Sequence, residues 1–194
     1  MPGPMQKPKF SRAAIVAALL ALPLSACSTP RTVGPTELPV TRWDHRPEAP
    51  MWTKATLNAL KREGAVLLSA VPQDVDAFCP GYRAATADQR GAFWTGLFSA
   101  IAQYESTWNP GAVGGGGRYL GLLQISPQTA RSAGCNATAL KDGTENLSCA
   151  VKIAARKADR AGVQGVVSDW GPMHDASKRR AISSWTRNQS YCQA

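Results

Sequence analysis

Histidine is scarce in this 194-residue sequence. His45 and His174 are the only two, and neither stands at metal-ligand spacing from a cysteine. The sequence therefore gives no indication of a metal site, and we expect no cofactor. The glycine run 114–117 lacks the Gly-Lys-Ser/Thr ending of a phosphate-binding loop. No run of Lys and Arg is interleaved with aromatic residues, so nucleic acid is not an expected partner.

Strand patterns and internal repeats are also missing. Apolar residues recur at helical spacing instead, which predicts a mainly α-helical fold. The helices are expected over about 53–68, 86–108, 127–133, 144–161 and 176–187, with a loop over 163–173. Apolar residues make up 44% of the chain and charged residues 18%, a composition that favours one packed domain.

The first 26 residues have the layout of a secretory signal. Basic residues precede the apolar run 13–24, which is too short to span a bilayer stably. Leu24-Ser25-Ala26-Cys27 resembles the lipobox of bacterial lipoproteins, which implies cleavage before Cys27 and its acylation. Ser28 then favours the outer membrane, with the protein facing the periplasm. The alternatives are an ordinary signal peptide with an incidental cysteine, or a short membrane anchor.

The residues that follow the leader are expected to form a tether and then a basic domain. Residues 27–50 hold five prolines without helical periodicity, so we expect an extended tether, with the globular domain over 51–194. Removal of the leader leaves 19 of the 22 basic residues against 13 acidic ones, a net charge of +6. A basic exported protein suits an anionic envelope polymer or a membrane surface.

Four cysteines remain beyond Cys27, and an even number in an oxidising compartment predicts two disulfides. Three pairings are possible. We favour Cys135 with Cys149, which closes a short loop, and Cys79 with Cys192, which ties the C-terminal tail to the start of the domain. The alternative is four buried thiols.

Glu105 is the most conspicuous acidic residue. Thr86 to Gln89 form a capping box that starts a helix expected to run to about Trp108. Glu105 follows Ile101 by four positions and precedes Trp108 by three, which puts a carboxyl group on the buried stripe. Burial and the negative end of the helix dipole both raise a carboxyl pKa, as a proton donor requires. The alternative is a core glutamate bonded to a main-chain amide.

The motifs around Glu105 occur in an order that resembles a known family. They are Glu105-Ser106-x-Trp108-Asn109-Pro110, Gly121-Leu122-Leu123-Gln124-Ile125, Thr129-Ala130 with Gly134, and Glu145-Asn146-Leu147. Together, over about 86–161, they resemble the SLT-type lytic transglycosylase domain of the lysozyme-like superfamily. The resemblance implies a single lysozyme-like (goose-type) catalytic domain. It also implies cleavage of the bond between N-acetylmuramic acid and N-acetylglucosamine in peptidoglycan.

The resemblance also implies how such an enzyme works. One glutamate, matching Glu105, protonates the leaving oxygen. It then deprotonates the C6 hydroxyl of the muramic acid, which closes a 1,6-anhydro ring.

The same resemblance implies roles for several neighbours of Glu105. Ser106 and Gln124 would bond the sugar in the groove, and Gly121 would let the main chain approach the glutamate. Asn146 would line the site from the next helix. Apart from the resemblance, Tyr119 is expected to stack on a sugar, because an aromatic ring next to a sugar cleft offers an apolar face. The alternatives are local: a bond within the helix for Ser106, a turn for Gly121, a helix cap for Asn146 and a core position for Tyr119.

The sequence departs from the family pattern in two places. Leu123 replaces a common methionine, a nearly volume-conserving change. The Ala-Tyr-Asn segment whose tyrosine supports the glutamate is missing, and residues 168–173 stand there instead, so Trp170 or Tyr104 would have to substitute. Two other functions therefore stay open. One is a hydrolysing muramidase with a second carboxylate such as Asp169, and the other is a catalytically silent lipoprotein that binds glycan strands.

Overall fold

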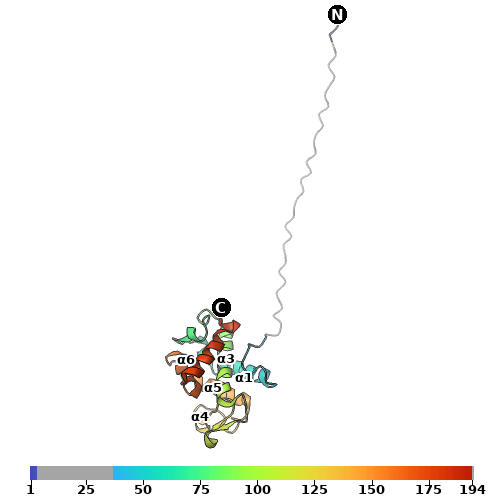
Figure 1. The fold of residues 1–194 in the computed structure, drawn as a ribbon. Helices are drawn as coiled ribbons and strands as arrows, with labels where there is room; N and C mark the ends of the chain where they lie inside the picture. The colour runs from blue at the N-terminus through green and yellow to red at the C-terminus, as the bar shows by residue number, and fades with distance from the viewer. Residues whose placement is uncertain (4–36, 194) are drawn as a thin grey trace. The chain divides into compact units, whose positions relative to one another are not determined.

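The structure, a computed structural model, describes residues 1–3 and 37–193 (Figure 1). The predicted apolar run of the leader, the acylation site at Cys27 and residues 27–36 of the predicted tether lie outside these described residues. Contacts group Glu37–Ala194 into one compact unit. Within the described part of the chain, no helix combines the length and the apolar character needed to cross a membrane.

Helix α3 (Ala87–Ser106) forms the centre of this unit and packs against α1, α2, α7 and two short 3-10 helices. The predicted capping box is present, with Thr86 Oγ1 accepting from the Gln89 main-chain N–H and the Gln89 side chain accepting from Thr86 N. Every residue from Gly91 to Ala102 is buried. The helix is therefore surrounded on all sides, rather than on the single stripe that the apolar spacing predicts.

The other elements surround α3. The α-helices are α1 (Ala49–Arg62), α2 (Ala65–Ser69), α4 (Pro127–Ser132), α5 (Gly143–Ala155), α6 (Gly162–Val166) and α7 (Ala176–Arg187). The 3-10 helices are η1 (Val75–Ala77), η2 (Gly115–Gly117), η3 (Gly171–Met173) and η4 (Ser190–Cys192). Strands β1 (Val113–Gly114) and β2 (Tyr119–Leu120) pair antiparallel around η2. The mainly helical prediction is confirmed, and the last helix has the predicted bounds.

Three local predictions differ from the structure. The helix predicted over 53–68 is divided at Gly64, where a β-carbon would lie 2.6 Å from Val151 Cγ1. The helix predicted to reach residue 161 ends at Ala155, and the predicted loop 163–173 contains α6 and η3. The glycine run 114–117 lies in the short hairpin of β1 and β2. Gly115, Gly116 and Gly117 have left-handed backbone conformations, which glycine adopts without steric cost, and these allow the chain to turn between β1 and β2.

The folded unit begins at Glu37, so residues 37–50 are not part of a tether. Trp43 is fully buried, and its indole N–H donates to Thr53 Oγ1 at 2.9 Å. The main-chain N–H of Arg42 donates to Ser99 Oγ of α3, also at 2.9 Å. Prolines marked the segment as extended, but burial of this tryptophan fixes it against the core.

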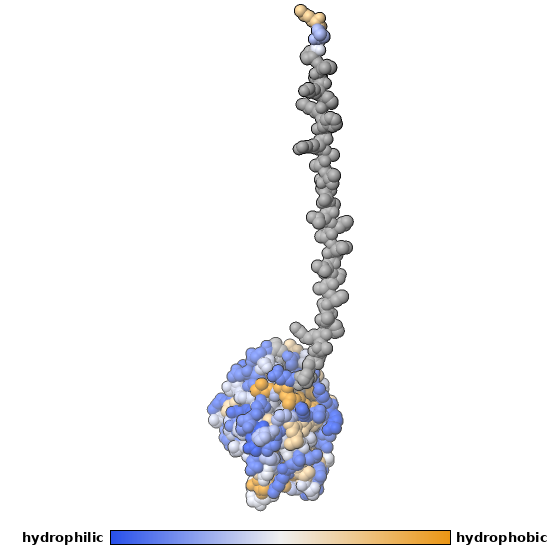
Figure 2. Space-filling model, turned by 90° about the vertical axis from the view of Figure 1, so that its right-hand side faces the viewer, coloured by the Kyte–Doolittle hydropathy of each residue, from blue (hydrophilic) through white to orange (hydrophobic). Residues whose placement is uncertain are grey.

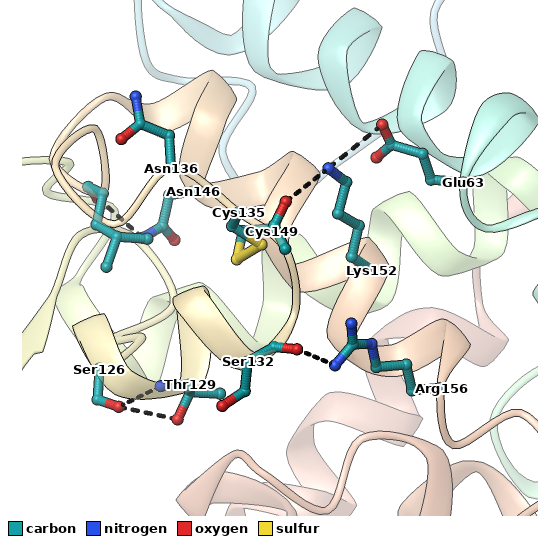
Figure 3. The surroundings of a disulfide bond; sticks show 12 residues. Glu63, Ser126, Thr129, Ser132, Cys135, Asn136, Asn146, Cys149, Lys152 and Arg156 are labelled. Carbon is teal, nitrogen blue, oxygen red and sulfur yellow. Dashed lines mark hydrogen bonds and ion pairs between the residues drawn. A yellow bond between two sulfur atoms is a disulfide. The ribbon is translucent and has the colours of Figure 1, made fainter.

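Both predicted disulfides are present. Cys79–Cys192 has its α-carbons 4.7 Å apart and joins η4 to the segment before α3. Cys135–Cys149 has its α-carbons 5.7 Å apart and joins α5 to the residues that follow α4 (Figure 3).

The surface is largely polar. The face of the folded unit in Figure 2 is mostly hydrophilic, with separate hydrophobic areas. Among residues 37–193 the exposed large hydrophobic side chains are Val40, Met51, Val66, Val71, Val113 and Tyr119.

Candidate active site

Glu105 is the next-to-last residue of α3. The helix ends at Ser106 because Thr107 and Trp108 take left-handed conformations, with φ of 51° and 55°. The helix predicted to run to about Trp108 therefore ends two residues earlier. Trp108 turns back on the helix, where its indole N–H donates to the Ser99 carbonyl at 2.8 Å, and its ring centroid lies 4.6 Å from that of His45. Such strain in non-glycine residues concentrates at functional sites.

Two cavities lie beside this helix end. The first has a volume of about 310 Å³ and is lined by Glu105, Tyr119, Gln124, Asp169, Trp170 and Gly171. The second has a volume of about 230 Å³ and is lined by Tyr119, Leu123, Gln124, Ile125, Ser126, Thr129, Ile153, Asp169 and Trp170. Four residues line both: Tyr119, Gln124, Asp169 and Trp170. The two cavities are therefore neighbouring parts of one groove, with Glu105 at one end.

Glu105 is half-buried rather than fully buried. Burial is the largest influence and raises its pKa from 4.5 to about 7. The Gly171 main-chain N–H and the Lys178 ammonium act in the opposite direction. A β-carbon at Gly171 would lie 4.0 Å from Glu105 Oε1, so this main chain lies beside the carboxyl group. At neutral pH the group is present in both protonation states, and it can therefore both give and accept a proton.

Lys178 lowers the pKa of Glu105, and it should therefore lower the pH at which activity declines on the alkaline side. Its ammonium lies 5.9 Å from the centroid of the Tyr104 ring, next to Glu105. Lys178→Met removes a cation that lowers the pKa of Glu105, so that pKa should rise further. A general acid works while protonated, so the alkaline limb of the rate against pH should move to higher pH. Asp169, the other carboxylate of the cavity, is unchanged in this variant.

Rates over a pH series on purified peptidoglycan, the substrate that the sequence resemblance implies, measure this shift. Lys178→Arg keeps the charge and should keep the wild-type limb, and Arg180→Met removes an exposed cation elsewhere on α7. An alkaline limb that moves equally in Lys178→Met and Arg180→Met would contradict a specific effect of Lys178.

Gln124 and Tyr119 line the groove, as predicted. Gln124 has a left-handed backbone with φ of 45°, and its amide N–H groups donate to the Gly121 and Ala112 carbonyls at 2.9 and 3.4 Å. Its side-chain oxygen lies over Gly114, where a β-carbon would come within 2.2 Å of it. Tyr119 is 42% exposed and presents its ring to both cavities.

Asn146 does not line the groove, although its predicted role placed it there. It is fully buried. Its side-chain oxygen accepts from the Leu123 N–H at 2.9 Å, and its amide group donates to the carbonyls of Leu120 and Leu140 at 3.0 and 2.9 Å. Figure 3 shows Asn146 on the same helix as the disulfide-bonded Cys149. Because both donors and the acceptor are used, Asn146 fixes the turn that carries Gln124.

Ser106 and Gly121 are also absent from the residues that line the two cavities. The Ser106 hydroxyl lies 2.8 Å from the Leu122 carbonyl, to which it donates, and this bond joins α3 to the Gln124 turn. Gly121 has φ of 80°, and a β-carbon there would lie 2.1 Å from the Leu140 carbonyl oxygen and 2.3 Å from Asn146 Nδ2. The close approach at Gly121 is therefore to Asn146 and Leu140, not to Glu105.

Residues 168–173 supply the opposite wall. The Trp170 indole N–H donates to the Leu123 carbonyl at 2.9 Å, and its ring packs edge-on to Phe98. Trp170 thus supports the Gln124 turn. Within residues 37–193, no side chain donates a hydrogen bond to Glu105. Neither Trp170 nor Tyr104 therefore takes the place of the tyrosine that supports the glutamate in the family pattern.

Gly171 and Lys178 were not expected at this site. They lie more than 60 positions after Glu105, on η3 and α7. Only the tertiary fold brings them to the carboxyl group, and no local spacing in the sequence marks them.

The fold and groove define a lysozyme-like helical domain with one glutamate of raised pKa in its cleft. Residues 83–168 match the family model of the Transglycosylase SLT domain. This match covers somewhat less than half of the chain.

Solved structures of one protein, Bd0314 DslA, are similar to this chain. Its wild-type form 2 is 26% identical, with a TM-score of 0.70, and the alignment covers 81% of this chain and 100% of that one. Two variants, in each of which a different glutamate is replaced by glutamine, have the same identity and coverage and a TM-score of 0.71. A comparison with curated proteins found no match.

Proposed function

We propose that this protein is a peptidoglycan lytic transglycosylase. It would cleave the β-1,4 bond between N-acetylmuramic acid and N-acetylglucosamine without water and leave 1,6-anhydromuramic ends. The observation that carries the proposal is Glu105, a carboxyl group of pKa about 7 at the end of a groove. The SLT domain supports glycan strands of peptidoglycan as the substrate.

The proposed reaction uses Glu105 twice. The protonated carboxyl group first gives its proton to the glycosidic oxygen of the departing N-acetylglucosamine, and the bond from that oxygen to C1 breaks. The carboxylate then takes the proton of the muramic acid C6 hydroxyl as that oxygen bonds to C1. The carboxyl group is thus restored, and proton and bonds balance without water or a metal ion.

The distribution of acidic residues supports a single catalytic carboxyl group. From Ser106 to Lys141 the sequence contains no Asp or Glu, so the whole Gln124 side of the groove is free of acids. The other carboxylate that lines the groove, Asp169, is in an ion pair with Lys157 at 2.6 Å. A glycosidase that uses two carboxylates needs the second one free to act on water or on C1.

A hydrolysing muramidase is the second candidate, because Asp169 lines the same cavity as Glu105. In that reaction Asp169 would activate a water molecule or bind C1, and the products would gain the elements of water. The two reactions therefore differ in the mass of every new end.

Product analysis separates the two. The chain from Ser28 onward, which includes the compact unit Glu37–Ala194, is incubated with purified peptidoglycan, and the soluble fragments are weighed by mass spectrometry. Anhydro ends that increase with time are the expected result. Reducing ends alone would favour hydrolysis, and no release of fragments would favour a glycan-binding protein.

We further propose that Cys27 carries the lipid anchor and that the domain faces the periplasm from the outer membrane. The lipobox-like sequence supports this, and the nine residues from Ser28 to Thr36 can reach at most ~30 Å. Loss of palmitate labelling and of membrane association in Cys27→Ser would be the expected result. Unchanged labelling would sink the proposal.

A further inference from the structure

The groove has a middle section where its two cavities meet. Tyr119, Gln124, Asp169 and Trp170 line both cavities there. A ligand that extends from the Glu105 end into the second cavity must pass these four side chains. Their chemistry therefore decides which groups of the substrate are accepted in this section.

The middle section offers hydrogen-bond acceptors and apolar surface. The half-exposed Tyr119 ring supplies the apolar surface, and the indole N–H of the buried Trp170 is used by the Leu123 carbonyl. The Gln124 amide N–H groups are used by main-chain carbonyls, which leaves its side-chain oxygen as an acceptor. Asp169 adds a carboxylate, a group that accepts only. A ligand rich in hydroxyl and amide N–H donors on a carbon ring, such as an N-acetylated sugar, fits this arrangement.

Asp169 is held by one cation. Lys157, just after α5, places its ammonium 2.6 Å from Asp169 Oδ2 and donates to Ser168 Oγ at 3.2 Å. The side chains of Lys157 and Asp169 are 26% and 37% exposed, so the pair lies at the groove wall and is not enclosed. The ammonium contacts Asp169 Oδ2, and no side chain among residues 37–193 donates to Oδ1, which can therefore accept from a ligand.

We propose that Asp169 contacts the glycan as a hydrogen-bond acceptor and that Lys157 is its positioning residue. The inference rests on the proposed function for the nature of the substrate. It assigns to Asp169, which lies in the segment 168–173 where the family carries a different sequence, the recognition of sugar hydrogen-bond donors beside the cleaved bond. Asp169 in this role is a binding residue, not the base that a hydrolysing enzyme would need.

Binding without turnover tests this pairing directly. In a Glu105→Gln background, the affinity for a soluble N-acetylglucosamine–N-acetylmuramic acid tetrasaccharide is measured by calorimetry. Asp169→Asn should weaken binding on the order of tenfold, because a hydrogen bond to a charged group is lost. Lys157→Met should weaken it by a similar factor, and Lys157→Arg should restore most of the affinity.

The double variant gives the sharper result. If Lys157 acts through Asp169, Lys157→Met should have no further effect once Asp169→Asn is present, because coupled residues are not additive. Ser168→Ala, which removes the other Lys157 partner, is the matched control and should bind like its parent. Thermal unfolding of every variant checks that the fold is kept. Additive losses, or Asp169→Asn binding as well as its parent, would overturn the inference.

Turnover with Glu105 intact separates this inference from the proposed function. Asp169→Asn should raise KM on peptidoglycan with little change in kcat, and its products should keep the wild-type ratio of anhydro to reducing ends. A collapse of kcat or a change in that ratio would show that Asp169 takes part in the chemistry and would overturn the binding role. If wild type itself yields no anhydro ends, the proposed function fails, while the calorimetric result still decides the Asp169 contact.

Discussion

Glu105→Gln should reduce the release of anhydro fragments from peptidoglycan by roughly 10²- to 10⁴-fold, the usual contribution of a general acid. Glutamine keeps the shape of the side chain but can neither give a proton to the leaving oxygen nor take one from the C6 hydroxyl. Asp169, the other carboxylate that lines the groove, pairs with Lys157 and is therefore not expected to replace Glu105. The measurement is the initial rate of fragment release, with products weighed at each time point.

The same substitution should not harm the fold. The pKa of Glu105 is raised from 4.5 to about 7 in the folded protein, so the folded state holds more protons than the unfolded state across this range. Stability of the wild-type protein should therefore fall as pH rises from about 4.5 to 7, and Glu105→Gln should remove this decline. Thermal unfolding at pH 5 and pH 8 measures it.

Glu63→Gln is the control for Glu105→Gln, because it changes a surface glutamate at the end of α1 that pairs with Lys152 and lines neither cavity. It should retain the wild-type rate. A Glu105→Gln protein that folds and still releases anhydro fragments at the wild-type rate would remove Glu105 from the chemistry. A wild-type protein that only binds peptidoglycan would instead support the silent lipoprotein.

The sequence predicted those parts of the fold that depend on neighbours along the chain. The capping box at Thr86 and Gln89, the start of α4 at Pro127, and the bounds of α7 all arise within one or two helical turns. The two disulfides followed from a count of cysteines in an oxidising compartment and from loop length. Local signals of this kind need no knowledge of the tertiary fold.

Glu105 was predicted for a related reason, since the helical period alone put a carboxyl group among apolar side chains. The roles of Ser106, Gly121 and Asn146 were harder to predict. Each belongs to one of the motifs that resemble the family pattern. Hydrogen bonds and close contacts between residues far apart in the sequence show that each supports the Gln124 turn. A motif marks that a residue is needed, and it does not distinguish a group that touches the ligand from one that holds its neighbour.

Trp43 lies in a segment that was predicted to be outside the folded unit but is part of it. Proline content predicted an extended tether to residue 50, but a single indole with a hydrogen bond to Thr53 outweighs that tendency. Burial of a large aromatic side chain contributes ~1.5–3 kcal/mol, enough to hold a short segment on the core. Composition therefore placed the boundary of the folded unit too late.

Removal of the Cys79–Cys192 disulfide, whose two cysteines are fully buried, should be strongly destabilising. The bond spans 113 positions, and a cross-link over about 100 residues is worth ~4.7 kcal/mol in the chain-entropy description. The Cys79→Ala, Cys192→Ala double variant should therefore unfold roughly 9–19 °C lower than wild type, from the ~2–4 °C per kcal/mol expected at this size. Differential scanning calorimetry of both proteins under non-reducing conditions measures the change.

The second disulfide provides a matched comparison within the same chain. Cys135–Cys149 spans 14 positions, so its removal should cost ~3 kcal/mol, about 1.5–2 kcal/mol less than the long cross-link. The short loop lies beside Asn146 and the Gln124 turn, and the long one holds η4 against the start of the domain. For the same decrease in unfolding temperature, loss of Cys135–Cys149 should therefore lower activity more than loss of Cys79–Cys192. Equal losses of stability in the two double variants would show that local strain and packing, and not loop length, determine the contribution of these disulfides.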